Sequence, residues 1–230
     1  MNCATVEEDV RSIREYCMLV TFEGLDFCGK TTQVQILESW LSASVSGAKV
    51  TVVREPGGTR ISELIRDLLL DPYHAEIDAV AELFLFSAAR SQLVRQNILP
   101  ALKRGDIVIC DRFADSTVAY QGYGRGIDLD TIDKINTLAT AGVVPDTTFL
   151  LDISPEESYR RRGSYGAMVK SDDRMEQSGI AFYARVREGY LAIARAYPER
   201  VFLIDGTKPV DVIAGEIQTI LKQRGVGKNI

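Results

Sequence analysis

Five short runs of β-forming residues recur along the chain and alternate with segments of helical hydrophobic spacing. The runs cover residues 17–22, 49–53, 106–110, 147–151 and 200–204. Apolar strands joined by helical crossovers form a parallel sheet that is buried on both faces. Ligands bind such sheets beyond the carboxyl ends of the strands. The alternation therefore predicts an α/β fold, with helices flanking a parallel sheet and functional residues directly after each run.

The segments between these runs have the apolar spacing of helices. We predict helices at residues 31–45, 61–70, 75–103, 130–141, 174–196 and 210–223. Residues 155–177 differ, because charges and glycines predominate there, and this composition predicts a mobile lid or a solvated loop. No linker rich in Pro, Gly or Ser divides the chain, so we expect a single domain at 17–230. The mixed-charge residues 1–16 are interpreted as an N-terminal extension and are a candidate for mobility.

Charge and cysteine usage restrict the partners and the compartment. The 27 Lys and Arg residues are outnumbered by 32 Asp and Glu residues, for a net charge of -5, so no nucleic-acid partner is expected. Any polyanion must be bound by a local basic cluster. The four cysteines lack the spacing of a disulfide framework, which favours a reducing, cytoplasmic location. The apolar runs are far shorter than the roughly 20 residues of a membrane helix, so no membrane partner is expected.

The segment that follows the first run fits the phosphate-binding pattern GxxxxGK[ST]. Its sequence is GLDFCGKT, and it stands where a strand passes into a helix. In such a loop the backbone amides and the positive end of the helix face the phosphates, the lysine reaches the β- and γ-phosphates, and the hydroxyl binds magnesium. We expect ATP to bind Gly24, Leu25, Asp26, Phe27, Cys28, Gly29, Lys30, Thr31 and Thr32.

Magnesium in such a loop needs a carboxylate as well as a hydroxyl. Asp111 follows the apolar run at 106–110, at the place where a second acidic residue stands in P-loop enzymes. We therefore predict that Thr31 and Asp111 hold Mg²⁺. A simple cap of the following turn is the alternative role for Asp111.

A P-loop alone does not distinguish a switch, a motor and a kinase. The chain has no NKxD segment that would bind guanine, and no DxxG segment beyond the second run. Arginines and aromatic residues instead gather after the predicted strands, where they suit a second ligand that is both anionic and planar. A phosphorylated nucleoside has both properties, so the pattern favours a kinase.

Several further segments occur in order along the chain: FEGLDFCGKTTQ, REPGGT, LFLFSAAR, DRFADSTVAYQGYGRG and DRMEQ. From about Met18 to the C-terminal helix the chain resembles the thymidylate kinase family, and the joint occurrence of REPGG with DR…YQG is more specific than the P-loop. The resemblance implies a three-layer P-loop kinase fold with a five-stranded parallel sheet, usually in a homodimer. It also implies magnesium-dependent transfer of the γ-phosphate of ATP to dTMP, which yields dTDP and ADP in dTTP synthesis.

The resemblance also implies roles around the acceptor nucleotide. Arg112 matches the arginine that binds the acceptor phosphate, and a guanidinium suits a dianionic monophosphate. Phe86 matches the ring on which thymine stacks, and Arg90, on the same helical face, matches the arginine that binds the base. Tyr120 matches the residue that blocks a ribose 2′-hydroxyl. The implied dTMP-binding set is Asp26, Arg54, Glu55, Arg66, Phe86, Arg90, Arg112, Ser116, Thr117, Tyr120 and Gln121.

Two departures from the family pattern concern the transferred phosphoryl group. Phe27 stands where bacterial relatives have Gly and eukaryotic relatives have Arg. Because phenylalanine cannot neutralise charge at the γ-phosphate, the arginine that does so is expected from residues 155–177. The stretch that follows the three arginines of this segment is longer than the family pattern, so the acting arginine stays open. The implied catalytic set is Lys30, Asp26, Arg112, Arg160, Arg161 and Arg162.

Two other functions remain as alternatives. A deoxynucleoside kinase would need a carboxylate base, for which Glu23 or Glu55 is available, but the arginines around its acceptor would have no anion to bind. A non-catalytic ATP-binding regulatory protein would need no acceptor site. For a homodimer, Leu83, Leu93 and Val94 form a candidate apolar stripe, although core and interface residues look alike in a sequence.

Overall fold

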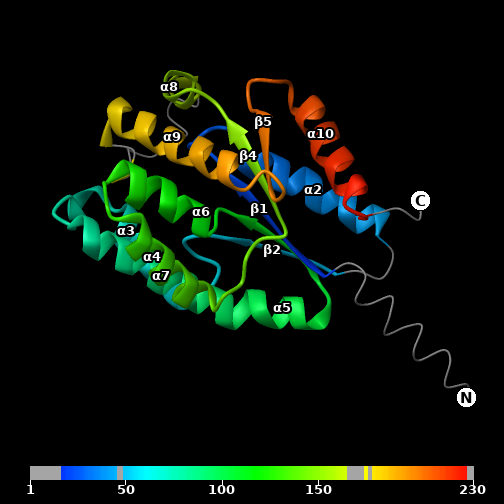
Figure 1. Cartoon of the computed structure of the whole chain (residues 1–230), viewed down its shortest axis with the longest axis horizontal. Helices are drawn as coiled ribbons and strands as arrows, with labels where there is room; N and C mark the ends of the chain where they lie inside the picture. Colours follow the sequence, from blue (N-terminus) through cyan, green and yellow to red (C-terminus); the bar gives the residue numbers. More distant parts are fainter. Residues whose placement is uncertain (1–16, 46–48, 165–173, 176–177, 227–230) are drawn as a thin grey trace, which may run out of the picture.

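The structure is a computed structural model, and it describes residues 17–45, 49–164, 174–175 and 178–226 (Figure 1). The predicted N-terminal extension lies outside these residues. So does most of the second half of the predicted lid.

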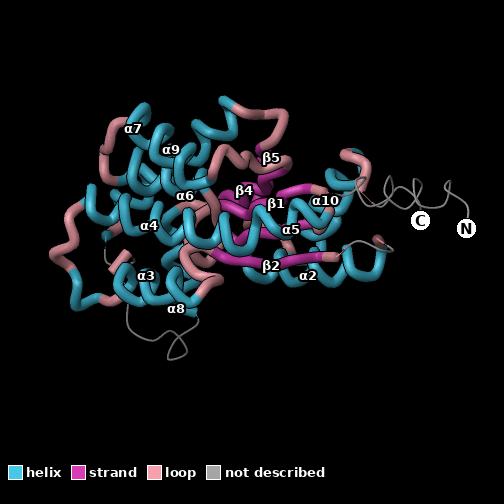
Figure 2. Tube along the Cα trace, turned by 90° about the horizontal axis from the view of Figure 1, so that it is seen from below, coloured by secondary structure: helices cyan, strands magenta, loops and turns pink. Residues whose placement is uncertain are grey.

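A five-stranded parallel sheet forms the centre of the molecule, with helices on both sides (Figure 2). The strand order is β2-β3-β1-β4-β5, and every neighbouring pair is parallel. This confirms the predicted α/β architecture. The strands are β1 (Met18–Glu23), β2 (Val50–Arg54), β3 (Ile107–Asp111), β4 (Thr147–Asp152) and β5 (Val201–Asp205).

Helices connect the strands and cover the sheet. The α-helices are α2 (Lys30–Ser44), α3 (Arg60–Leu70), α4 (Ala79–Leu93), α5 (Leu99–Arg104), α6 (Ala114–Thr117), α7 (Leu129–Thr140), α8 (Pro155–Ser164), α9 (Ile180–Ala196) and α10 (Val210–Gln223). Two π-helical segments, η2 (Val94–Ile98) and η3 (Val118–Gly124), and the 3-10 turn η1 (Pro72–His74) complete the described elements. None of the described helices is both long and apolar enough to cross a membrane.

The central strand β1 is buried along its whole length, which explains its mostly apolar sequence. Successive strand residues face opposite sides of a sheet. Val20 packs in one core cluster with Leu37 of α2, whereas Leu19 packs in a second cluster with Leu93 and Ile98. These two clusters fix the sheet between its helical layers, and the loops at the carboxyl ends of the strands are held in place by both.

The helix predicted at 75–103 begins later and has an irregular centre. It begins at Ala79, because the Asp78 side chain accepts a hydrogen bond from the backbone N–H of Val80 and caps the first turn. The chain then continues through η2 into α5. Gly105, in the left-handed region at φ 86°, ends this helical path.

The first half of the predicted lid is an α-helix rather than a loop. The Ser154 hydroxyl accepts a hydrogen bond from the N–H of Glu157, and acidic residues occupy the first turn of α8 while arginines occupy the last. This charge order suits the helix dipole and outweighs the low apolar content of the segment. The following helix was predicted from 174 but begins at Ile180, after Gly179.

Candidate active site

The loop between β1 and α2 has the sharply turned backbone that a phosphate cradle requires. Gly24 and Gly29 have φ values of 133° and 101°, which side chains rarely permit. Phe27 also lies in the left-handed region, at φ 61°, although it is not a glycine. Lys30 folds over the loop, because its Nζ donates to the carbonyl oxygens of Leu25 at 2.8 Å and Gly24 at 3.3 Å. The ammonium group is thus held where phosphates would meet the loop amides.

The described part of the predicted lid contacts this loop directly. Ser158 of α8 donates a hydrogen bond to the backbone oxygen of Asp26 at 2.7 Å. Arg161 donates to the backbone oxygen of Phe27 at 3.4 Å and to that of Gly206 at 2.8 Å. The helix and the phosphate loop are therefore joined by hydrogen bonds.

The two residues predicted to hold magnesium lie side by side. Thr31 is the second residue of α2, and Asp111 is the last residue of β3, the strand next to β1. The Thr31 hydroxyl donates to Asp111 Oδ2 at 2.9 Å. A hydroxyl and a carboxylate are the hard oxygen ligands that Mg²⁺ prefers, so this donor set fits the ion.

A cavity of about 110 Å³ opens beside the phosphate loop, on the side of α4 and η3. Ten of the eleven residues expected to bind dTMP line it; Arg54 does not. The lining residues are Asp26, Glu55, Pro56, Arg66, Leu70, Phe86, Arg90, Arg112, Ser116, Thr117, Tyr120, Gln121 and Met175. The sequence motifs after β2 and β3 and those on α4 thus meet at one cavity, which we call the acceptor cavity.

Arg54 differs from the expectation. Its guanidinium pairs with Glu63 of α3 at 2.9 Å, and its side chain is 48% exposed. The preceding Val53 and the following Glu55 are both buried. Because consecutive residues of an extended chain point to opposite sides, Arg54 and Glu55 cannot both face one cavity.

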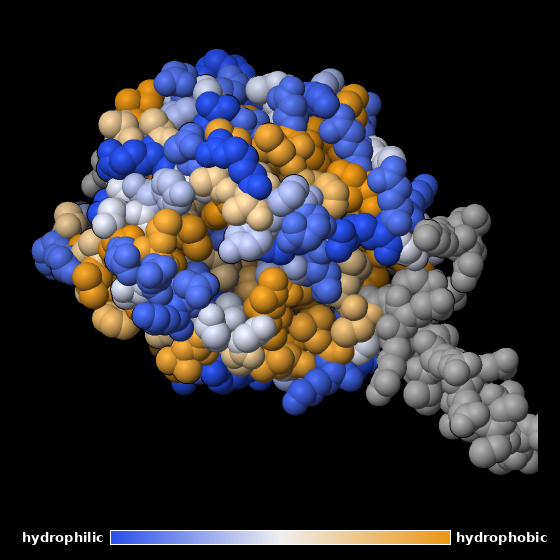
Figure 3. Space-filling model, viewed as in Figure 1, coloured by the Kyte–Doolittle hydropathy of each residue, from blue (hydrophilic) through white to orange (hydrophobic). Residues whose placement is uncertain are grey.

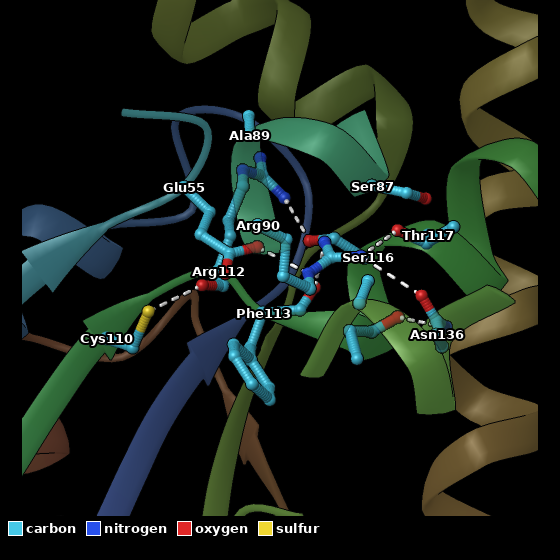
Figure 4. A network of polar contacts seen from close by, with 12 residues as sticks. Glu55, Ser87, Ala89, Arg90, Cys110, Arg112, Phe113, Ser116, Thr117 and Asn136 are labelled. Atoms are coloured by element: carbon cyan, nitrogen blue, oxygen red, sulfur yellow. Dashed lines mark hydrogen bonds and ion pairs between the residues drawn. The ribbon is translucent and has the colours of Figure 1, made fainter. Parts of the chain in front are cut away.

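Arg90 is held in place because it donates hydrogen bonds to residues of several elements (Figure 4). Its Nε donates to Glu55 Oε2 at 2.6 Å, and its Nη1 donates to Thr117 at 2.7 Å and Asn136 at 3.0 Å. Its Nη2 donates to the backbone oxygen of Phe113 at 3.0 Å. Burial raises the pKa of Glu55 even though Arg90 opposes this. Both side chains are almost fully buried, so the guanidinium plane is fixed before any ligand binds.

Arg112 is oriented by a strained backbone and by the phosphate loop. Its φ of 69° lies in the left-handed region, which points its side chain back toward β1. Nη2 donates to Asp26 Oδ1 at 2.6 Å, and Nη1 donates to the backbone oxygen of Gly24 at 2.9 Å. Burial alone would raise the pKa of Asp26, but Arg112 and Lys30 bring it below its usual range. The acceptor cavity therefore contains a charged pair at its junction with the phosphate loop.

Glu23 lies behind this pair and is 1% exposed. Its carboxylate accepts hydrogen bonds from the N–H of Phe113 at 2.7 Å, from Ser116 at 2.6 Å and from the hydroxyl of Tyr190 at 2.9 Å. Burial, with a contribution from Asp115, raises the pKa of Glu23 to about 7. Glu23 does not line the acceptor cavity. Glu55 does line it, but its carboxylate is paired with Arg90, and this pairing disfavours a role as a base on an acceptor hydroxyl.

A second cavity, of about 370 Å³, lies on the other side of the phosphate loop. It extends along α8 and the start of α10, and we call it the donor cavity. It is lined by Phe27, Cys28, Gly29, Thr32, Gln33, Arg160, Arg161, Ser164, Gly206, Lys208, Val210 and Ile213. The loop that carries the phosphate pattern thus separates two cavities.

The three consecutive arginines of α8 point to different places. Arg160 is 66% exposed and pairs with Glu157 at 2.7 Å. Arg161 pairs with the same glutamate but is only 23% exposed, and both arginines line the donor cavity. Arg162 lines a small cavity together with Asp26 and Phe27 of the phosphate loop. The structure therefore distinguishes three side chains that are equivalent in the sequence.

Several residues that shape the site carry no motif in the sequence. Glu82 lies in α4 and Asn136 in α7, and each is hydrogen-bonded to a residue of the acceptor cavity. Tyr190 lies in the middle of α9. Met175 lines the acceptor cavity, and its place within the DRMEQ segment was the single available signal.

The parallel sheet, the phosphate loop after β1 and a cavity on each side of that loop define a P-loop kinase. A family model described as thymidylate kinase matches residues 22–217. The chain therefore belongs to the thymidylate kinase family, whose members are phosphotransferases.

Individual relatives agree with this family. A thymidylate kinase of Chlorobaculum parvum is 50% identical over 193 residues, which cover 82% of this chain and 88% of that protein. A thymidylate kinase of Geobacter sp. (strain M21) is 45% identical over 210 residues, or 89% of this chain and 91% of that protein. The crystal structure of thymidylate kinase from Ehrlichia chaffeensis matches with a TM-score of 0.70 at 38% identity, over 89% of this chain and 98% of that chain. The predicted family and P-loop kinase fold are thus confirmed.

Proposed function

We propose that this protein transfers the γ-phosphate of ATP to dTMP, releasing dTDP and ADP as a step of dTTP synthesis. The observation that carries the proposal is the acceptor cavity, whose lining includes both the buried Arg90 and the Arg112–Asp26 pair. A nucleoside monophosphate has a polar base at one end and a dianion at the other. Membership of the thymidylate kinase family supports thymine as the base.

In this proposal the acceptor is bound from base to phosphate. The thymine ring stacks on Phe86 and is hydrogen-bonded by Arg90 and Gln121. The Arg112 guanidinium packs over the ring of Tyr120, with its Cζ atom 5.2 Å from the ring centre. This packing holds the ring in place and supports the proposed exclusion of a ribose 2′-hydroxyl. Arg112 and Arg66 bind the monophosphate, which is already ionised at neutral pH, so no general base is required.

ATP binds the phosphate loop, with its nucleoside in the donor cavity. The loop amides and Lys30 bind the β- and γ-phosphates. Thr31 and Asp111 would hold Mg²⁺, which neutralises phosphate charge when it is bound. Arg162, beside Asp26 and Phe27, is the proposed arginine that stabilises charge on the migrating phosphoryl group, since Phe27 cannot.

A homodimer is proposed through the outer faces of α3 and α4. The face of the molecule that Figure 3 shows is a mixture of hydrophobic and hydrophilic residues. The predicted stripe of Leu83, Leu93 and Val94 is wrong, because all three side chains are buried in the core. The exposed apolar residues of the two packed helices are Ile61, Leu64, Leu68, Val80 and Phe84. A charged substitution, Leu64→Asp, should convert a dimer to a monomer in sedimentation-velocity measurements.

A cytoplasmic location and a single domain at 17–230 complete the proposal.

The test is ADP formation with dTMP, dUMP, the ribose analogue of dTMP and thymidine as separate acceptors. We expect dTMP to stimulate ATP consumption most strongly and thymidine not at all. Stimulation by thymidine alone would favour the deoxynucleoside kinase. ATP binding without stimulation by any acceptor would favour the regulatory protein and would contradict the proposal.

A further inference from the structure

The amide group of Gln121 has only one chemically acceptable orientation. Its Nε2 lies 2.8 Å from Glu82 Oε1. An ionised carboxylate accepts hydrogen bonds and cannot donate them, so the NH₂ group of the amide must face Glu82. Gln121 also lines the acceptor cavity. The amide oxygen, an acceptor, is therefore turned away from Glu82 and is available to a ligand there.

Glu82 is held in its charged form by two arginines. Its side chain is fully buried, and it accepts hydrogen bonds from Arg125 at 3.0 and 3.2 Å and pairs with Arg174 at 2.7 Å. Burial raises the pKa of Glu82, but the donors of Arg125 and Gln121, with the charge of Arg174, bring it below its usual range. Reversing the Gln121 amide would place its oxygen against a buried carboxylate, which low-dielectric surroundings make costly.

The two arginines are themselves held in place by other residues. The Glu82 carboxylate that they bind therefore cannot move to accommodate a reversed Gln121 amide. Arg125 lies over the ring of Phe182, 4.5 Å from its centre. Arg174 donates through Nε to the backbone oxygen of Leu69 at 2.8 Å. Glu82 thus connects α4, η3 and the residues that precede α9 in one buried cluster.

An acceptor facing a pyrimidine selects between bases at ring position N3. Thymine and uracil carry an N–H there, whereas neutral cytosine has a lone pair that would oppose the amide oxygen. Arg90, whose guanidinium is also fixed, offers donors only, which oppose the exocyclic amino group of cytosine. The two side chains therefore present complementary groups to one edge of thymine.

We propose that Glu82 is a specificity-determining positioning residue, which locks the Gln121 amide so that the acceptor cavity admits a pyrimidine with an N3–H and rejects cytosine. This inference rests on the proposed function, because it concerns the base of the same acceptor nucleotide. Glu82 does not touch the substrate. It acts through Gln121.

The principal test compares kcat/KM for dTMP and dCMP in the wild type and in Glu82→Gln. A glutamine at 82 can present either its oxygen or its NH₂ group, so the Gln121 amide becomes free to reverse. We expect the ratio of the two kcat/KM values to fall by about tenfold or more, with KM for dTMP rising and kcat changing little. A ratio that stays within about twofold of the wild type in a folded variant overturns the inference.

Two further variants separate this outcome from a general loss of stability. Asp115→Asn breaks a buried carboxylate–arginine pair, with Arg200, that does not contact Gln121, and it should leave the base ratio unchanged. Gln121→Ala removes the amide itself and keeps the test decisive even if Glu82→Gln does not fold. In the Gln121→Ala background the ratio should already be lowered, and Glu82→Gln should lower it no further. An unaltered ratio in Gln121→Ala overturns the inference.

The proposed function is judged separately, on the wild type alone. If the wild type does not phosphorylate dTMP, the proposed function fails. If it does, and the variants keep its base ratio, only the role of Glu82 fails.

Discussion

The two cavities beside the phosphate loop are built in different ways. In the acceptor cavity, Arg90 is 2% exposed and each of its three nitrogens donates to a protein partner, while Gln121 is backed by the buried Glu82. In the donor cavity the arginines come from α8, where Arg160 is 66% exposed. Buried polar networks fix side-chain orientation, which base recognition requires. Phosphates are bound largely by backbone amides, which need no such network.

This difference implies that substitutions on the two sides have different consequences. A buried charge that loses its partner destabilises the whole protein, because it stays away from water. An arginine at a more open site loses little stability when it is removed, so its contribution is seen in the rate. Acceptor-side variants should therefore change stability and selectivity together, whereas donor-side variants should change turnover alone.

The largest expected effect is on the rate. Replacing Arg162 with alanine should lower kcat by about 10³ and alter the KM for dTMP by less than about threefold, because charge on the migrating phosphoryl group is greatest in the transition state. Steady-state kinetics checks this, and circular dichroism should show that the variant is folded. The Arg160→Ala variant should have a much smaller effect on kcat. Equal losses in kcat and in dTMP affinity would indicate a structural role for Arg162.

The largest expected effect on stability is on the acceptor side. Arg90→Ala should lower the free energy of unfolding by about 3–5 kcal/mol, because it leaves Glu55 buried without a counter-charge. Urea denaturation measures this loss. As a control, Arg195→Ala removes an exposed ion pair with Glu188 and should cost less than about 1 kcal/mol. Similar losses of unfolding free energy in the two variants would mean that burial of the Arg90–Glu55 pair adds nothing to stability, which would contradict this prediction.

Glu23 should make stability depend on pH. Its pKa in the folded protein is about 7, against an ordinary value of 4.5, so the folded protein binds this proton more tightly than the unfolded chain. Its contribution is therefore fully present below about pH 4.5 and is lost as the pH rises to about 7, an effect of about 3 kcal/mol. Urea unfolding between about pH 5 and 8 should show a steeper loss in the wild type than in Glu23→Gln.

The exposed Glu188 provides the control for this measurement. Glu188→Gln should reproduce the wild-type slope, because its carboxylate lies at the surface. Identical slopes for the wild type and Glu23→Gln would mean that Glu23 stays ionised in the folded protein across this range.

The smallest expected effect concerns the Tyr120 hydroxyl. It donates to Asp26 Oδ2 at 3.3 Å, a long contact, while the ring makes the packing that we relate to sugar selection. Tyr120→Phe should lower kcat/KM for dTMP by less than about fivefold and keep the preference over the ribose analogue. Competition assays with both nucleotides measure this preference. Its loss in Tyr120→Phe would assign sugar selection to the hydroxyl rather than to the ring.

The sequence was informative wherever local pattern determines structure. The strands, the phosphate loop and the meeting of Thr31 with Asp111 follow from apolar runs and from the topology of a parallel sheet. The positions of Arg54 and of the three α8 arginines did not follow, because the side of the chain that each faces depends on packing with other elements. Glu82 carries no local signal at all. Its importance arises from contacts with residues about 40 to 90 positions away in the chain.

Asp26 accepts hydrogen bonds both from α8 and from the arginine that follows β3. Its backbone oxygen accepts from Ser158 of α8, and its carboxylate accepts from Arg112. Any displacement of α8 would therefore be transmitted through Asp26 to Arg112. Each substrate should consequently change the affinity of the protein for the other. Calorimetric titration of a non-hydrolysable ATP analogue should show different affinities with and without dTMP. Equal affinities would mean that the two halves of the site work independently.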